Sequence, residues 1–282
     1  MKERCSSMLI DTVRLGLGRG LIEFRQSLTL VLNYIFFPCI ALIVMYFLRG
    51  VEVSGSGTSL GSFAIPGVLA INVLFSGLMG LATNLIAERE DGSLLRVKSL
   101  PYGIHTYLVG KISSQVALTF ITFCVVLIGA SVLFGQFVSA DPVELANLVW
   151  ILPLGMTATL PFGAILGSLV KNPRNLSFVS LLLMALVSVS GVLYPLANQA
   201  YWMQAIGQAT PLYWLGQALR AALLGDAAAA AEIGGRWHLA ETALVLGAWS
   251  VVGCIAAVFV LRRAARRDAG AKISGAVPAR AE

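Results

Sequence analysis

Residues 62–93 read SFAIPGVLAI NVLFSGLMGL ATNLIAERED GS. Residues 62–87 carry no charged side chain, and about 20 apolar helical residues are enough to cross the hydrocarbon core of a membrane. The next six residues, Glu88, Arg89, Glu90, Asp91, Gly92 and Ser93, contain four charges in succession. In a chain that is 57% hydrophobic and 12% charged, this break predicts a polar elbow at the membrane surface that contacts another molecule.

The same alternation of apolar runs and short polar breaks extends over most of the 282 residues. The mean hydropathy is +0.83, and the charged fraction is about half of that in an ordinary soluble protein. The pattern predicts an all-α polytopic membrane protein with six transmembrane helices. We expect them at about 28–48, 62–87, 106–134, 147–170, 176–194 and 238–261. Gly163 and Gly167 in the fourth have the spacing that permits close helix packing.

Three regions flank or interrupt this transmembrane domain of residues 28–261. Residues 1–27 form a cytoplasmic N-terminus, in which the apolar residues at 8–25 recur at helical spacing and predict an amphipathic helix in the membrane interface. Residues 195–237 are too broken by proline and alanine-rich stretches for a straight span, and predict an outer re-entrant or interfacial helical region. Residues 262–282 form a basic cytoplasmic tail that we expect to be disordered.

The basic residues indicate the orientation. With both termini inside, seventeen of the 20 Lys and Arg residues fall on the inner side, and only Arg49, Arg220 and Arg236 fall outside. This bias follows the positive-inside rule and predicts a multi-pass membrane protein with both termini in the cytoplasm. It also accounts for the net charge of +6 without nucleic acid as a partner.

Several kinds of site lack their signatures. Gly110-Lys111 is the only Gly-Lys pair and is followed by Ile112, so the chain has no phosphate-binding Gly-x-x-x-x-Gly-Lys-Ser/Thr loop for ATP. His105 and His238 are far apart in the sequence, and the four cysteines have no paired spacing. These spacings indicate neither a metal site nor a disulfide framework, and no catalytic residue is predicted.

Few polar groups lie inside the predicted spans. Asn33, Asn72, Asn84 and Gln115 could form helix–helix hydrogen bonds or contact a substrate, and the sequence leaves both open. Lys111 and Glu241 lie near span ends, where we expect them to reach the surface. An ion-coupled carrier needs titratable groups deep in the membrane, and none is evident. The chain therefore has the build of a membrane pathway without an energy source, which predicts an energising partner.

Two motifs and the order of the segments resemble the permease subunit of type-2 ABC exporters (the ABC-2 family), especially bacterial drug- and antibiotic-resistance permeases. The first motif is the elbow from Ala87 to Arg96, followed by Ser99-Leu100-Pro101. The second runs from Gly191-Val192-Leu193-Tyr194-Pro195-Leu196 through Trp202 and Thr210-Pro211-Leu212-Tyr213 to Leu219-Arg220. The resemblance covers nearly the whole chain.

The resemblance implies a mechanism and partners. Two permease chains, as a homodimer or heterodimer with the first and fifth spans at their contact, would pair above two separate ABC ATPase subunits. ATP and Mg²⁺ would bind only to the ATPases, and this chain would bind no cofactor. The elbow would be the helix that couples the two subunits, through Glu88, Arg89, Glu90, Asp91, Gly92, Ser93 and Leu94.

The resemblance also assigns an outer gate, with Tyr194, Pro195, Trp202, Pro211 and Tyr213. The aromatic members also fit an interfacial belt at the level of the lipid headgroups. Phe36, Phe37, Asn72 and Met184 are candidates for lining the pathway, as are Met45 and Leu193.

The function implied is export of an amphipathic drug, antibiotic, lipid or glycolipid, driven by ATP hydrolysed in another subunit and not by this chain. Two alternatives remain open from the sequence: an ion-coupled secondary carrier, and a membrane assembly factor that transports nothing. The substrate is not determined by the sequence.

Overall fold

The computed structural model describes residues 28–53, 58–91, 103–135, 142–170 and 172–275, together with residues 15, 18 and 137. The predicted interfacial helix at 8–25 lies almost wholly outside these ranges, as do Gly92, Ser93 and Leu94 of the elbow.

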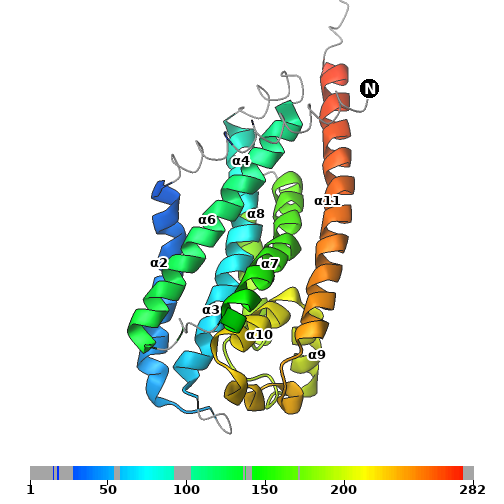
Figure 1. Ribbon diagram of the computed structural model, residues 1–282. Helices are drawn as coiled ribbons and strands as arrows, with labels where there is room; N and C mark the ends of the chain where they lie inside the picture. Colours follow the sequence, from blue (N-terminus) through cyan, green and yellow to red (C-terminus); the bar gives the residue numbers. More distant parts are fainter. Residues whose placement is uncertain are drawn as a thin grey trace, which may run out of the picture.

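The described chain is helical apart from its connections and one isolated bridge between Glu52 and Ser59 (Figure 1). The α-helices are α2 (Leu28–Phe47), α3 (Leu60–Phe75), α4 (Leu81–Glu90), α6 (Gly103–Phe134), α7 (Pro142–Leu169), α8 (Pro173–Val189), α9 (Tyr201–Ala209), α10 (Pro211–Leu223) and α11 (Leu239–Gly275). Short 3₁₀ segments are η1 (Leu48–Gly50), η3 (Asp226–Ala231) and η4 (Ile233–Gly235), and η2 (Ser76–Gly80) is a π-helical segment that joins α3 to α4.

Four stretches of helix are long and apolar enough to cross a membrane: Leu60–Glu90, Val109–Phe134, Ala146–Leu169 and Leu239–Arg263. They coincide with four of the six predicted spans to within a few residues. The two remaining predicted spans, 28–48 and 176–194, overlap α2 and α8, although α8 ends at Val189, five residues before the predicted end. Both helices appear as shorter apolar helices, Ile35–Gly50 and Arg174–Val189. The protein is thus a multi-pass helical membrane protein, and the count of six remains a prediction.

Local sequence explains where the helices begin. The Ser59 side chain accepts a hydrogen bond from the Ser62 backbone N–H and caps α3. At α8 the Asn172 side chain caps the helix by accepting from Arg174 N–H, and Pro173 occupies the first turn, where its missing N–H costs nothing. The polar turn between the fourth and fifth predicted spans is therefore the start of α8.

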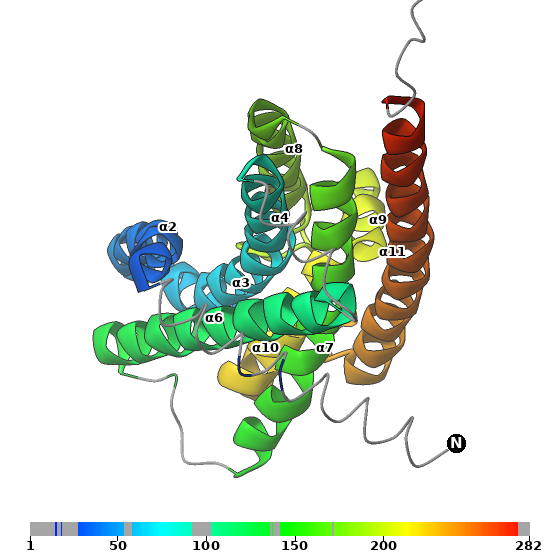
Figure 2. The same cartoon turned by 90° about the horizontal axis from the view of Figure 1, so that it is seen from above.

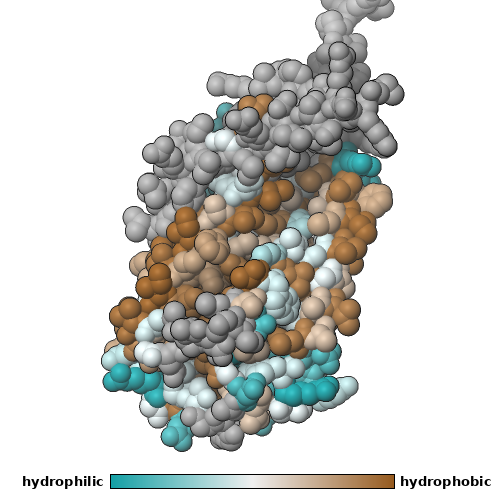
Figure 3. Space-filling model, viewed as in Figure 1, coloured by the Kyte–Doolittle hydropathy of each residue, from teal (hydrophilic) through white to brown (hydrophobic). Residues whose placement is uncertain are grey.

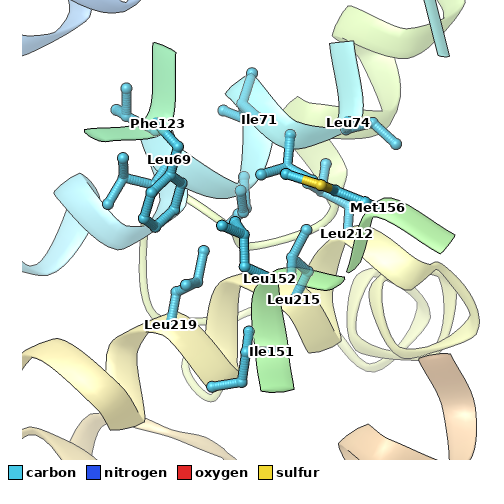
Figure 4. Packing of buried hydrophobic residues seen from close by; sticks show 14 of the residues in the cluster. Leu69, Ile71, Leu74, Phe123, Ile151, Leu152, Met156, Leu212, Leu215 and Leu219 are labelled. Atoms are coloured by element: carbon cyan, nitrogen blue, oxygen red, sulfur yellow. The ribbon is translucent and has the colours of Figure 1, made fainter. Parts of the chain in front are cut away.

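The core lies where α3, α6, α7 and α10 meet (Figure 4). Helix α3 is buried along almost its whole length, which explains why it shows no polar face. Its Leu69 and Leu74 lie with Phe123 of α6, Leu152 of α7 and Leu215 of α10 in one apolar cluster. Through η2, the central α3 leads into α4, whose last residues are Glu88, Arg89 and Glu90.

Glycines set the distance between α7 and the chain from η2 to α4. A Cβ added at Gly163 would lie 2.5 Å from the Gly77 carbonyl oxygen and 2.8 Å from that of Leu78, and one at Gly167 would lie 2.8 Å from the Leu85 Cβ. Two backbones can approach this closely only where side chains are missing. The predicted packing role of Gly163 and Gly167 is therefore confirmed.

The two ends of the bundle differ. The end of α4, the start of α6 and the end of α7 meet at one end, and α9, α10, η3 and η4 form a cap at the other (Figure 1). Viewed from above, α2 and α11 stand at opposite margins of the bundle (Figure 2). A brown apolar band separates teal polar atoms at the capped end from others on the upper part of α11 (Figure 3).

The structure revises the expected tail and describes the expected outer region. Helix α11 continues to Gly275, so residues 262–275, for which we expected a disordered tail, extend the last helix beyond the predicted span. Residues 195–237 fold into α9, α10, η3 and η4 and pack mainly on α3, α7, α8 and α11. That region is helical as expected, and its re-entrant position in a membrane remains a prediction.

Candidate functional site

The charged end of α4 is tied to its neighbours by its first two charged residues. The Lys111 ammonium lies 2.5 Å from Glu88 Oε1, and the Tyr107 hydroxyl donates to Glu88 Oε2. Arg89 donates through Nη2 to the Ser168 carbonyl oxygen at the end of α7, at 3.4 Å. Glu88 thus fixes α4 to α6, while Arg89 reaches α7.

The side chains of Glu90 and Asp91 are exposed, as is that of Arg89, whereas Glu88 is partly buried. Glu90 and Asp91 follow directly on the anchored pair, at the point where α4 ends. The described members of the predicted coupling set are therefore Glu88 and Arg89, which bond to α6 and α7, and the exposed carboxylates of Glu90 and Asp91.

Lys111 corrects one expectation. We expected it to reach the surface from a span end, but its side chain is 7% exposed and lies against the partly exposed carboxylate of Glu88. A buried ammonium needs such a partner, because desolvation without one costs several kcal/mol. Sequence inspection missed the pair since its members are 23 residues apart, one in the elbow after the second predicted span and the other in the third span.

Three of the six proposed pathway residues, Phe37, Asn72 and Met184, meet at a hollow of about 190 Å³ between α2, α8 and the chain from α3 to η2. The hollow is lined by Phe37, Pro38, Ile71, Asn72, Phe75, Ser76, Met79 and Met184. Phe36 is exposed on α2 and does not line it. The arrangement is an apolar hollow with one amide and one hydroxyl in its wall.

Behind this wall, α3 and η2 are joined to α6 by a buried polar network. Gln115 donates through Nε2 to the Ser76 carbonyl oxygen at 2.8 Å, and the hydroxyls of Ser76 and Thr119 share a hydrogen bond of 2.6 Å. Thr122 donates to the Asn72 amide oxygen at 3.1 Å. Asn72 and Gln115 thus form helix–helix hydrogen bonds, one of the two roles that the sequence left open for them.

The π-helical segment Ser76–Gly80 lies at the centre of this network, and its position could not be predicted from composition. Such segments are uncommon and occur often at functional sites. Here the segment supplies Ser76 and Met79 to the hollow, and Ser76 also accepts the bond from Gln115.

The predicted gate residues are distributed over different environments in the cap. Trp202 is exposed on α9, whereas Tyr213 is 1% exposed and donates to Glu232 Oε2 at 3.3 Å. Burial raises the pKa of Tyr213 far above its ordinary value, and the nearby Glu232 carboxylate adds to the shift. Tyr213 is therefore a protonated core residue and not part of an interfacial belt.

Tyr194 and Pro195 lie in the loop that joins α8 to α9, where the Tyr194 hydroxyl donates to the Ser188 carbonyl oxygen at 2.5 Å. Pro211 occupies the first turn of α10. The five predicted gate residues therefore belong to one cap, although the structure does not bring their side chains together in one cluster.

A buried ion pair holds this cap, and sequence analysis missed it. Arg220 Nε lies 2.6 Å from Glu232 Oε1, and both side chains are 0% exposed. Arg220 also donates to the Val192 carbonyl oxygen at 2.9 Å, and its guanidinium lies over the Phe63 ring at 4.8 Å. The charge count places Arg220 in an outer polar segment, but its side chain joins α10 to η3 through Glu232, to the 191–192 turn through Val192 and to α3 through Phe63.

Within the part of the chain that the structure describes, no three His, Cys, Asp or Glu side chains gather in a way that could hold a metal ion.

Comparison with known sequences indicates the family of the chain. A sequence profile described as ABC-2 family transporter protein matches residues 43–261, well over half of the chain. The chain is also similar to "Putative transport permease YvfS" of Bacillus subtilis (strain 168), with 25% identity over 146 residues. That similarity spans 51% of this chain and 58% of the relative's length. From the long apolar helices and the family match, we conclude that this chain belongs to the ABC-2 family as a membrane permease subunit without a catalytic domain of its own.

Proposed function

We propose that this permease exports an amphipathic drug, antibiotic, lipid or glycolipid across the bacterial inner membrane, with both termini in the cytoplasm. Family membership implies a separate ABC ATPase as the partner. Two permease chains, identical or different, would form the pathway, and ATP and Mg²⁺ would bind to the ATPase.

The observation that carries this proposal is the division of charge at the end of α4. Glu90 and Asp91 are exposed, while the two residues before them are bonded to α6 and α7. A partner that pulls on the two exposed carboxylates would therefore move three helices together. Two of these three, α6 and α7, pack on α3, which lines the hollow.

The test separates partner contact from internal packing. Glu90→Lys should weaken co-purification with the cognate ATPase and reduce permease-stimulated ATP hydrolysis by about tenfold or more, because a reversed charge at a contact costs more than a lost one. Asp226→Lys, an exposed reversal in η3 at the other end, is the matched control and should leave both unchanged.

A double replacement of Glu88 and Glu90 would not separate partner contact from internal packing, since loss of Glu88 leaves Lys111 buried without its carboxylate. If Glu90→Lys folds normally, with unchanged thermal unfolding, and still couples as well as Asp226→Lys, the elbow does not contact the ATPase.

The hollow at α2 and α8 supports a pathway role for Phe37, Asn72 and Met184. Its apolar wall suits the hydrophobic part of an amphipathic molecule, and the Asn72 amide and Ser76 hydroxyl can serve a polar group. A second chain facing α2 and α8 would enclose the hollow, with Phe36 at the contact between the chains.

For the outer gate, we propose that the cap of α9 and α10 closes the far end of this path. The turn at Tyr194–Pro195 joins the cap to α8, so a movement of α8 would be transmitted to it. Trp202, exposed on α9, is placed to contact lipid headgroups or the second chain.

The rival function is an ion-coupled carrier, which needs titratable groups inside the protein. The structure contains two such pairs, Glu88–Lys111 and Arg220–Glu232. The two pairs lie at opposite ends of the bundle, and each is neutralised internally. Transport that survives ATP depletion but stops when the proton gradient collapses would favour the carrier over the exporter.

A further inference from the structure

A second hollow, unrelated to the proposed pathway, lies between α4, α6, α7 and α11. Its volume is about 300 Å³, and it is lined by Leu81, Leu85, Lys111, Ile112, Thr157, Leu160, Pro161, Ala164, Cys254, Ala257, Val258 and Leu261. Every one of these residues belongs to one of the four stretches that are long and apolar enough to cross a membrane. We call this hollow the α6–α11 groove.

The groove has the chemistry of the bilayer interior. Apart from Thr157 and Lys111 its lining side chains are apolar, and the Lys111 ammonium is paired with Glu88. Such a groove within the span region would be filled by hydrocarbon, because water cannot form hydrogen bonds with these walls. Brown apolar atoms gather over α6 and along α11 in Figure 3.

A positive charge stands just beyond one end of the groove. Val258 and Leu261 line it on α11, and Arg262 lies four residues after Val258, which places it on the same helix face one turn further along. Arg262 is exposed, as is its neighbour Arg263. Basic residues beside a cleft between transmembrane helices are suited to bind the headgroups of anionic lipids.

We propose that the α6–α11 groove binds an anionic phospholipid of the surrounding bilayer, with an acyl chain in the groove and the phosphate at Arg262. The site differs from the pathway hollow, since α2 and α8 contribute nothing to it. It adjoins Lys111, so a bound lipid would lie against the ion pair that fixes α4 to α6. Its occupancy can be measured without transport or ATP.

The test uses the purified full-length permease, delipidated and then titrated with phosphatidylglycerol or with phosphatidylcholine of the same acyl chains, with bound lipid counted by native mass spectrometry. Val258→Trp should fill the groove and weaken binding of either lipid more than tenfold, because each displaced methylene contributes to burial. Ile255→Trp is the matched control: it lies on the same helix and is similarly exposed (53% against 47%) but does not line the groove.

The headgroup is tested separately. Arg262→Gln should lower the preference for phosphatidylglycerol about fivefold, the effect of one basic residue near an anionic headgroup. Arg174→Gln, an exposed arginine at the same end on α8, should not change it. Equal loss of the preference in both variants would overturn the assignment of the phosphate to Arg262.

Cys254 provides a reporter inside the groove, and Cys39, exposed on α2, one outside it. Phosphatidylglycerol should slow alkylation of Cys254 by a membrane-soluble maleimide and leave Cys39 unaffected. If Cys254 is equally protected without lipid, the groove is closed or filled by protein. That result, or equal lipid binding by Val258→Trp and Ile255→Trp, would overturn the proposal.

Discussion

At the scale of single residues, the most consequential side chain is Arg220, which a topology count places in an outer polar segment. Its guanidinium is completely buried. It forms an ion pair with Glu232, donates a hydrogen bond to the Val192 carbonyl oxygen and lies over the Phe63 ring. A buried charge with a single acidic partner makes that partner indispensable, since removing it leaves the other charge desolvated.

Glu232→Gln should therefore destabilise the protein by about 3–5 kcal/mol, the usual cost of breaking a buried ion pair. The matched control is Glu241→Gln, because Glu241 is 45% exposed and lies 3.5 Å from Arg236. An exposed pair of this kind contributes less than about 1 kcal/mol. Thermal or denaturant unfolding in detergent checks both variants, and equal stability of the two would contradict a structural role for the Arg220–Glu232 pair.

At the scale of elements, the approach of α7 to the chain from η2 to α4 depends on residues without side chains. At Gly163 an added methyl group would collide with two backbone carbonyl oxygens. Backbone cannot move aside as a flexible side chain can, so the two elements would have to separate.

Gly163→Ala should cost about 1–3 kcal/mol of stability through overpacking. Gly247→Ala in α11 is the matched control, because nothing lies within 4 Å of the added carbon. That change should stabilise the protein by up to about 1 kcal/mol, the helix preference of alanine over glycine. Unfolding curves of the two variants should shift in opposite directions, and a neutral Gly163→Ala would show that α7 is free to move away.

The elements also show how far sequence reasoning reaches. Uninterrupted apolar runs predict α3, α6, α7 and α11 well, because crossing a membrane requires length and apolarity that are visible in composition. The pairs Glu88–Lys111 and Arg220–Glu232 could not be predicted, since each joins residues brought together only by tertiary packing. Phe37, Asn72 and Met184 were named as pathway candidates, but their common hollow depends on the placement of α2 and α8 beside η2.

At the scale of the whole molecule, α2 and α8 present exposed apolar side chains on both sides of the hollow, among them Phe36 and Phe178. In the proposed exporter this face meets a second permease chain. The second chain would cover the open side of the hollow, which would then be a closed path between the two chains.

A cysteine in place of Phe36, in a chain whose four native cysteines are replaced by serine, should form a bis-maleimide cross-link between two permease chains in membranes. Ile128→Cys in the same background is the control, because Ile128 is similarly exposed but lies on α6, away from the proposed contact. The mass of the product distinguishes a homodimer from a heterodimer. Cross-linking through residue 128 but not through residue 36 would place the contact elsewhere.

The π-helical segment at Ser76–Gly80 sets the direction in which the charged end of α4 points. In an α-helix each residue turns the chain by about 100°, and a π turn holds one residue more than an α turn. Everything after Gly80 is therefore rotated by about that angle relative to a continuous α-helix. Removing one residue from this segment would rotate α4 about its axis. Glu88 would then point away from Lys111, and Glu90 and Asp91 would lie on a different side of the helix. The local winding of this segment thus decides the direction in which the exposed carboxylates of Glu90 and Asp91 extend from the end of α4.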